Sequence, residues 1–196
     1  MIKFHKIFFP LLVLSIIWAV KIFEISSNIS LYTLGIYPRC LSCIFNIFTA
    51  PFIHGNLSHI YFNSIYWLIF SVAVFYLYPK RAYLYMASSF IDTGFLLWII
   101  GRKSYHIGLS GVIYALASFL FFSNLFAKDF RKSAISLAMI FLFAGMTQGF
   151  FPKEQYISWE AHISGAIIGF LLAIIEYKFE EYEDKEYRKK LYKDYT

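Results

Sequence analysis

Two residues of this sequence could act together in a serine-dependent acyl transfer. Ser110 lies between Gly108 and Gly111 at the start of an apolar segment, and His162 opens another apolar segment. A serine hydroxyl is a weak nucleophile until a neighbouring base takes its proton, and a neutral imidazole is the usual base. Taken singly, Ser110 also fits an ordinary helix N-cap, and His162 fits a lone histidine above a packing motif. Chemistry therefore depends on whether the fold brings the two side chains together.

A third stretch supplies two hydrogen-bond donors at helical spacing. His59 and Asn63 are four residues apart, so on a helix they share one face, one turn from each other. Neutral donors in a site of low dielectric constant stabilise the oxyanion that forms when a carbonyl is attacked. A helix that starts at Ser110 would add unpaired backbone N–H groups. Alone, the His59–Asn63 pair is more typical of packing side chains bonded to a neighbouring carbonyl.

Small residues predict how the serine and the histidine could meet. Each of the two segments carries a pair of small residues four positions apart: Gly111 with Ala115 after the serine, and Gly165 with Gly169 after the histidine. This spacing lets two membrane helices pack with their backbones close together. We therefore expect the two segments to touch, with the imidazole within hydrogen-bond reach of the hydroxyl.

The elements that must position these residues are six apolar segments. They cover residues 7–23, 57–77, 82–100, 110–126, 133–151 and 161–175. Most are close to the roughly 20 residues that span a bilayer. Of the 196 residues, 59% are hydrophobic and only 15% are charged, against roughly 45–50% and 25% in soluble domains. Lipid must solvate the excess, so the sequence predicts an all-α polytopic membrane protein with six transmembrane helices.

Lysine and arginine residues indicate the orientation in the membrane. The predicted inner segments hold Lys3, Lys6, Lys80, Arg81, Lys128, Arg131 and Lys132, with six more after Tyr177, whereas the outer side holds Lys21, Arg39, Arg102, Lys103 and Lys153. Basic residues are enriched on the cytoplasmic side of membrane proteins. We therefore expect both termini in the cytoplasm and the candidate chemistry near the outer face.

The chain is expected to form one membrane domain, residues 1–177, followed by a charged cytoplasmic tail, residues 178–196. The tail mixes acidic and basic residues and is typical of a solvated helix. The formal charge of +6 is spread over short groups between apolar runs, so no nucleic-acid partner is expected. The sequence shows no metal or nucleotide-binding pattern, so neither a metal nor a cofactor is predicted.

The stretch from Glu24 to Ile53 is too long and too apolar for a plain loop. We expect it to lie in the membrane interface or to dip partly into the bilayer. It contains Cys40 and Cys43, which could form a disulfide in an oxidising compartment or remain simple thiols.

Taken together, three stretches resemble the rhomboid family of intramembrane serine proteases. They run from His54 to Asn63 (HGNLSHIYFN), from Gly108 to Ala115 (GLSGVIYA), and from Ala161 to Gly165 (AHISG) with Gly169 beyond. Their order, spacing and helix placement agree with the family over residues 40–175. The resemblance implies a six-helix rhomboid-like bundle of the basic bacterial form, with a long outer loop between helices 1 and 2. It also implies residence in the bacterial inner membrane and substrates that are transmembrane proteins.

The resemblance also implies residue roles. Ser110 would be the nucleophile and His162 the general base and acid, in a dyad without a third acid. The oxyanion would be held by His59, Asn63 and the backbone N–H of Ser110. Supporting roles fall to Tyr114, packed on the histidine ring, to His54, which would support the long loop, and to Gly108, Gly111, Gly165 and Gly169. Glu160 is close to His162 in sequence, but it should point elsewhere on a helix.

The sequence departs from the family pattern at two places. Phe45 and Asn46 stand where many members have a Trp-Arg pair, and Phe75 stands where many have a glutamate. Both elements are mainly architectural, so these changes concern loop anchoring and stability more than chemistry.

Two other functions remain open at this stage. One is a catalytically silent scaffold that binds membrane clients without cutting them. The other is a small transporter that uses Asp92, although a buried polar contact or a kink partner is the plainer interpretation of that residue. For the protease, water would reach the dyad through an outer cavity covered by residues 149–160. The oligomeric state is left open.

Overall fold

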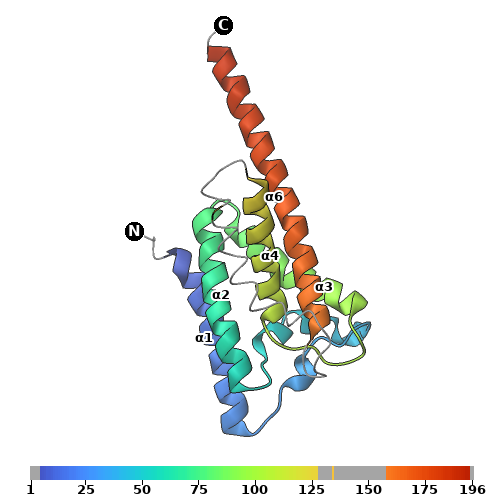
Figure 1. Cartoon of the computed structure of the whole chain (residues 1–196). Coiled ribbons are helices and arrows are strands. Elements are labelled where there is room, and N and C mark those ends of the chain that lie inside the picture. Colours follow the sequence, from blue (N-terminus) through green and yellow to red (C-terminus); the bar gives the residue numbers. More distant parts are fainter. Residues whose placement is uncertain (1–4, 128–133, 135–157, 195–196) are drawn as a thin grey trace.

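The computed structural model describes residues 5–127, 134 and 158–194, and its long elements are all helices (Figure 1). They are α1 (His5–Ser27), α2 (Leu57–Leu77), α3 (Ala82–Ile100), α4 (Ser110–Phe126) and α6 (Trp159–Asp194). Within these residues the only extended pairing is an isolated bridge between Ile36 and His106. The predicted all-α fold is confirmed. The predicted fifth segment and the covering loop fall largely outside the described residues.

Four of the described helices are long and apolar enough to cross a membrane, namely α1, α2, α3 and α6, and the apolar helix α4 is shorter. Many large apolar side chains on α1, α2 and α3 are exposed, among them Phe8, Ile22, Phe62, Leu84 and Phe95. Water disfavours such surfaces, whereas lipid does not. The chain is an integral membrane protein.

The bundle has two distinct ends. Helices α2, α4 and α6 begin at the same end, here termed the site end, and α1 and α3 end there. At the opposite end, termed the far end, α1 and α3 begin, and α6 projects well beyond the other helices (Figure 1).

The observed helix bounds match the predicted ones for α2, α3 and α4, while α1 and α6 are longer than expected. Helix α6 passes residue 177 without interruption, so the boundary of the charged tail is a change of composition and not a break in the helix. Ion pairs at helical spacing support the tail: Glu181–Lys185 at 2.7 Å and Asp184–Arg188 at 3.1 Å. Each exposed pair of this kind adds only about 0.3–0.5 kcal/mol.

Helix α4 is the central element of the bundle. Every residue from Gly111 to Leu120 is buried, and α4 packs against α2, α3 and α6, with α6 as its most extensive neighbour. Large side chains of the flanking helices, including Trp67, Phe70 and Tyr85, fill the core around it. The first residue of this enclosed helix is Ser110, so the fold holds that serine at the centre of the site end.

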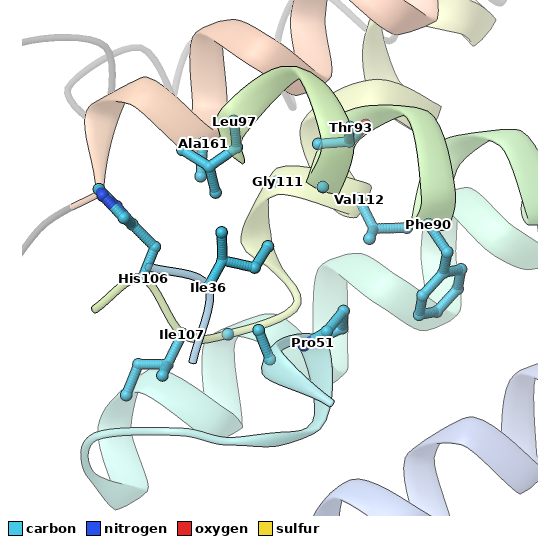
Figure 2. Close-up of a pocket in the computed structure, with 13 residues that line it drawn as sticks. Ile36, Pro51, Phe90, Thr93, Leu97, His106, Ile107, Gly111, Val112 and Ala161 are labelled. Atoms are coloured by element: carbon cyan, nitrogen blue, oxygen red, sulfur yellow. The ribbon is translucent and has the colours of Figure 1, made fainter. Parts of the chain in front are cut away.

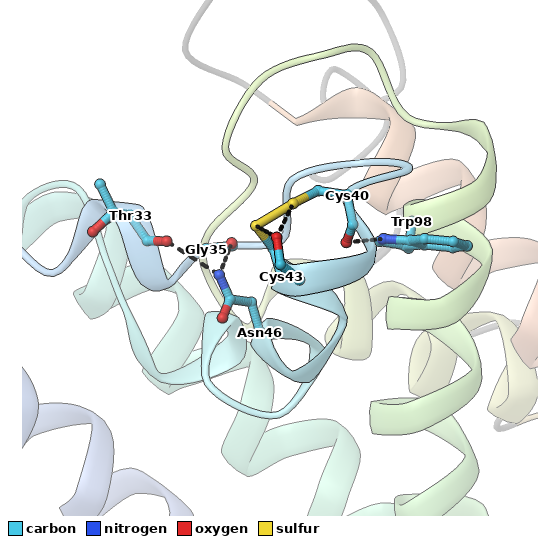
Figure 3. Close-up of a disulfide and its surroundings, with 7 residues drawn as sticks. Thr33, Gly35, Cys40, Cys43, Asn46 and Trp98 are labelled. Carbon is cyan, nitrogen blue, oxygen red and sulfur yellow. Dashed lines mark hydrogen bonds between the residues drawn. A yellow bond between two sulfur atoms is a disulfide. The ribbon is translucent and has the colours of Figure 1, made fainter.

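The loop between α1 and α2, residues 28–56, is termed the first loop. It contains three short 3-10 helices, η1 (Tyr32–Leu34), η2 (Leu41–Ile47) and η3 (Ala50–Phe52), which agrees with the expectation that it is no plain loop. Cys40 and Cys43 are joined by a disulfide, with their Cα atoms 5.2 Å apart (Figure 3). The indole Nε1 of Trp98 in α3 donates to the carbonyl of Cys40 at 3.1 Å, and this bond ties the loop to the bundle.

The two departures from the family pattern have local compensations. The Asn46 amide donates to the carbonyls of Thr33 at 3.1 Å and Gly35 at 2.8 Å, which anchors the first loop internally (Figure 3). Phe75 is buried and packs against Phe9 and Tyr83. Both positions therefore contribute to the architecture with different side chains.

Candidate active site

Ser110 and His162 are in direct contact at the site end. The imidazole Nε2 of His162 lies 2.9 Å from the hydroxyl Oγ of Ser110. His162 is only 7% exposed, while Ser110 is partly exposed. The ring of Tyr114, one turn along α4, stacks on the His162 ring with centroids 4.1 Å apart and planes 10° apart. This stacking holds the imidazole in the plane that faces the hydroxyl.

The contact between α4 and α6 follows from their small residues. A methyl group at Gly165 would collide with the backbone carbonyl of Gly111, and one at Gly169 would collide with the carbonyl of Ala115. The hydroxyl of Ser118 adds a hydrogen bond to the carbonyl of Ala166 at 2.7 Å. Backbone approach of this kind is possible only with glycine on α6. The spacing of small residues thus determines the distance between the two helix starts.

His59 and Asn63 both face the segment that leads into Ser110. A Cβ atom built on Gly108 would lie 2.7 Å from Cε1 of His59 and 3.7 Å from Nδ2 of Asn63. Gly108 has a φ of +105°, a conformation that favours glycine. The missing side chain lets the two donors lie against the peptide backbone two residues before the serine.

The side chain of His54 bonds to Asn63 and to the segment before Ser110. Its Nε2 lies 3.0 Å from the Asn63 amide Nδ2 and 3.5 Å from the backbone N of Leu109. Both partners are donors, so Nε2 accepts, and the ring is neutral. Burial, followed by the nearby charge of His59, lowers the pKa of His54 to about 3. His54 therefore uses one N–H of Asn63 and leaves the amide a second one.

The start of α4 supplies backbone donors at the same place. Ser110 is the first residue of the helix, and Leu109 before it gives no side-chain cap. The first N–H groups of an α-helix have no partner within the helix. Meanwhile the N–H of Gly108 donates to the carbonyl of Ala50 in the first loop at 2.9 Å, which fixes the approach to the helix.

Sequence reasoning missed His106, a buried residue at the same end. Its Nδ1 lies 2.6 Å from Oγ of Ser158, and its Nε2 lies 3.0 Å from the carbonyl of Arg102. Figure 2 shows His106 pointing toward the start of α6, with Ala161 nearby. A histidine four residues before the serine, in a short loop between two apolar segments, was the available signal.

The prediction of a buried contact for Asp92 is wrong. Asp92 lies on the exposed face of α3, whereas its neighbours Thr93 and Gly94 face the core. Its carboxylate accepts a hydrogen bond from Ser88, one turn earlier on the same helix. The one-sided packing of α3 turns this position outward, so the structure gives no support to a buried path that passes through Asp92.

The fold and the site together define a helical membrane protein with a serine–histidine pair at the starts of two packed helices. The rhomboid domain matches residues 42–179, which include both residues of the pair. The chain belongs to the rhomboid family.

Curated relatives of the chain come from mycobacteria. An uncharacterized protein of Mycobacterium tuberculosis is 26% identical over 170 residues, which cover 82% of this chain and 71% of the relative. An uncharacterized protein of Mycobacterium leprae is 26% identical over 171 residues, covering 83% of this chain and 68% of the relative. The similarity thus extends over most of both chains.

Proposed function

We propose that this protein is an intramembrane serine endopeptidase that cleaves transmembrane segments of other membrane proteins. The single observation that carries the proposal is the 2.9 Å contact between Ser110 Oγ and His162 Nε2 inside a lipid-facing bundle. Membership of the rhomboid family supports the same chemistry. No metal or organic cofactor enters the proposed reaction.

In the first half of the reaction, Ser110 attacks the carbonyl carbon of the scissile peptide bond. As the new C–O bond forms, His162 Nε2 accepts the hydroxyl proton. The C–N bond then breaks, and His162 passes that proton to the leaving amine. The product is an ester between Ser110 and the N-terminal fragment of the substrate.

The second half of the reaction regenerates the serine. A water molecule gives a proton to His162 and attacks the ester carbonyl, and the proton returns to Ser110 as the ester bond breaks. In both halves negative charge develops on the carbonyl oxygen. His59, the second amide N–H of Asn63 and the backbone N–H of Ser110 are the proposed donors to that oxygen. Each such donor contributes on the order of 10²–10³ in kcat.

The proposed substrate is a transmembrane segment that unwinds near the site end. A peptide bond inside an intact helix is shielded by its own backbone hydrogen bonds, so cleavage requires local unwinding. The distribution of basic residues favours a site end at the outer face of a bacterial inner membrane and both termini in the cytoplasm. Charged residues 178–194 of α6 would then extend into the cytoplasm as a tail.

The test is cleavage of a model transmembrane substrate in proteoliposomes that contain the purified parent protein. The parent should release a defined product, while Ser110→Ala and His162→Ala should each lower the rate by about 10⁴-fold or more. Asp92→Asn is the matched control on an exposed face, and it should cleave at the parental rate.

Two outcomes would contradict the proposal. Substrate bound by the parent without any product would favour the scaffold function. Cleavage that persists in Ser110→Ala would assign the activity to another nucleophile or to a contaminant.

A further inference from the structure

At each end of the bundle, a buried glutamate of α6 pairs with an arginine that lies next to α3. At the site end, Glu160 lies 3.4 Å from the guanidinium of Arg102, which follows α3. At the far end, Glu176 lies 3.1 Å from the guanidinium of Arg81, which precedes α3. The glutamate side chains are equally buried, each 4% exposed. Sixteen residues separate them on α6, which corresponds to about 24 Å along a helix.

The site-end pair is part of a larger set of contacts with the first turn of α6. The backbone N–H of Arg102 donates to the same Glu160 oxygen at 3.4 Å. Ser158, whose carbonyl accepts from the backbone N–H of His162 at 3.3 Å, is bonded through its hydroxyl to His106. These four residues, Arg102, His106, Ser158 and Glu160, are termed the outer clasp.

The protonation of His106 is fixed by its partners. The carbonyl of Arg102 can only accept, so Nε2 of His106 carries the proton and Nδ1 accepts from the Ser158 hydroxyl. Burial lowers the pKa of His106, which keeps this arrangement neutral. A carboxylate in the first turn of α6 is favourable as well, because a helix N-terminus carries partial positive charge.

The outer clasp connects the two chain segments that carry the reacting atoms. Residues 102–109 run directly into Ser110, and residues 158–160 run directly into His162. On the other side of the dyad, Gly165 packs against the backbone of Gly111. The Ser110–His162 pair therefore lies between two fixed contacts, the outer clasp and the glycine contact.

We propose that Glu160 is a positioning residue for catalysis, which sets the Ser110–His162 geometry through the outer clasp without touching the reacting atoms. The inference rests on the proposed function. A carboxylate two residues before the base holds the first turn of α6 against the loop that precedes the nucleophile. Arg102 and His106 are its partners in this role.

The experiment compares Glu160→Gln with Glu176→Gln, since both remove the charge of an equally buried glutamate paired with arginine. In proteoliposomes Glu160→Gln should lower kcat by about 10- to 100-fold, because misplacement by about 1 Å has effects of that size, and KM should change less than twofold. Glu176→Gln should keep the parental kcat per folded molecule. Glu160→Asp, which retains the charge, should recover part of the loss.

A second readout does not depend on activity. Amide hydrogen exchange over residues 159–163 should become faster in Glu160→Gln and stay parental in Glu176→Gln. Unchanged exchange in Glu160→Gln, or a kcat equal to that of the parent, would overturn the inference. Should the parent itself fail to cleave, the proposed function fails, and the exchange measurement alone decides whether Glu160 fixes the start of α6.

Discussion

The two ends of the bundle contain similar polar residues, but these residues differ in their exposure. At the far end, the Tyr78 hydroxyl lies 2.9 Å from Ser123 Oγ and 2.8 Å from Asn124 Oδ1, and all three residues are at most 5% exposed. At the site end, Ser110 and His59 are partly exposed. A serine and an asparagine thus occur at both ends, and both asparagines are buried. The serines differ: Ser110 at the site end is partly exposed, whereas Ser123 at the far end is buried.

This difference shows that polar residues inside a membrane bundle are not by themselves a sign of chemistry. Buried polar groups need partners, and at the far end the hydroxyl of Tyr78, which follows α2, bonds to Ser123 and Asn124 of α4. At the site end, His54 accepts from the Asn63 amide and holds that side chain beside Gly108, in the segment before Ser110. Substitutions at the two ends should therefore have different effects on activity and stability.

The largest combined loss of stability and activity is expected from the contact between α4 and α6 beside Ser110. Gly165→Val would drive a side chain into the backbone of Gly111 and separate α4 from α6. We expect the protein to lose about 3 kcal/mol or more of stability and the proteolytic rate to fall more than about 100-fold. Cleavage in proteoliposomes and thermal unfolding in detergent measure both. Gly55→Val is the control, because no atom of the described residues lies within 4 Å of a Cβ atom at Gly55, and it should resemble the parent.

The next largest effect on kcat is expected when one asparagine from each end is replaced by alanine and the two variants are compared. Asn63→Ala removes a proposed oxyanion donor and should lower kcat by about 10²–10³-fold. Asn124→Ala removes a buried partner of Tyr78 at the far end, so it should reduce stability by about 1–3 kcal/mol and leave the kcat of folded protein unchanged. Equal kcat values for the two variants would contradict the division between a catalytic end and a structural end.

A smaller effect concerns pH. The pKa of His54 is about 3 in the folded protein, below its ordinary value of 6.5, so the unfolded state binds the proton more readily. Stability should therefore be full above about pH 6.5 and should decline as the pH falls toward 3, with a slope of up to about 1.4 kcal/mol per pH unit. His106, whose pKa is also lowered, adds in the same direction. Unfolding of parent and His54→Gln between pH 7 and pH 5 tests this, and the variant should show a shallower slope.

The smallest effect is expected at the disulfide of the first loop. Cys40 and Cys43 are three residues apart, and closure of so short a loop is worth about 2 kcal/mol at most. The double variant Cys40→Ser/Cys43→Ser should unfold at a slightly lower temperature and cleave at nearly the parental rate, because Asn46 still anchors the loop. Complete loss of activity would show that the disulfide holds the site itself.

The sequence was sufficient for the parts of the molecule that depend on local patterns. The bounds of α2, α3 and α4 follow from apolar runs of membrane-spanning length, and the contact between α4 and α6 follows from Gly165 and Gly169. The tail after residue 177 was predicted to be a solvated helix, but its direct continuation from α6 was not predicted. Most of its charged residues are good helix formers in water, so the helix does not end where the apolar run ends.

Other features depend on three-dimensional neighbours that no spacing reveals. Asp92 was interpreted as a buried polar contact or a kink partner, and the first of these is wrong because packing along the whole helix decides which face of α3 meets α4. The buried glutamates Glu160 and Glu176 pair with arginines next to α3 that are more than fifty residues away in the chain. The same holds for His54, whose acceptor role toward Asn63 and Leu109 requires the first loop to fold back over the start of α4.

The most direct test of the central claim is the site at which a fluorophosphonate reacts, because this reagent requires a nucleophilic serine activated by a base. Intact mass and peptide mapping of the parent protein in detergent should show one adduct, on Ser110, that forms far more slowly in His162→Ala. An adduct on another residue, or equally fast reaction of Ser110 without His162, would contradict the account.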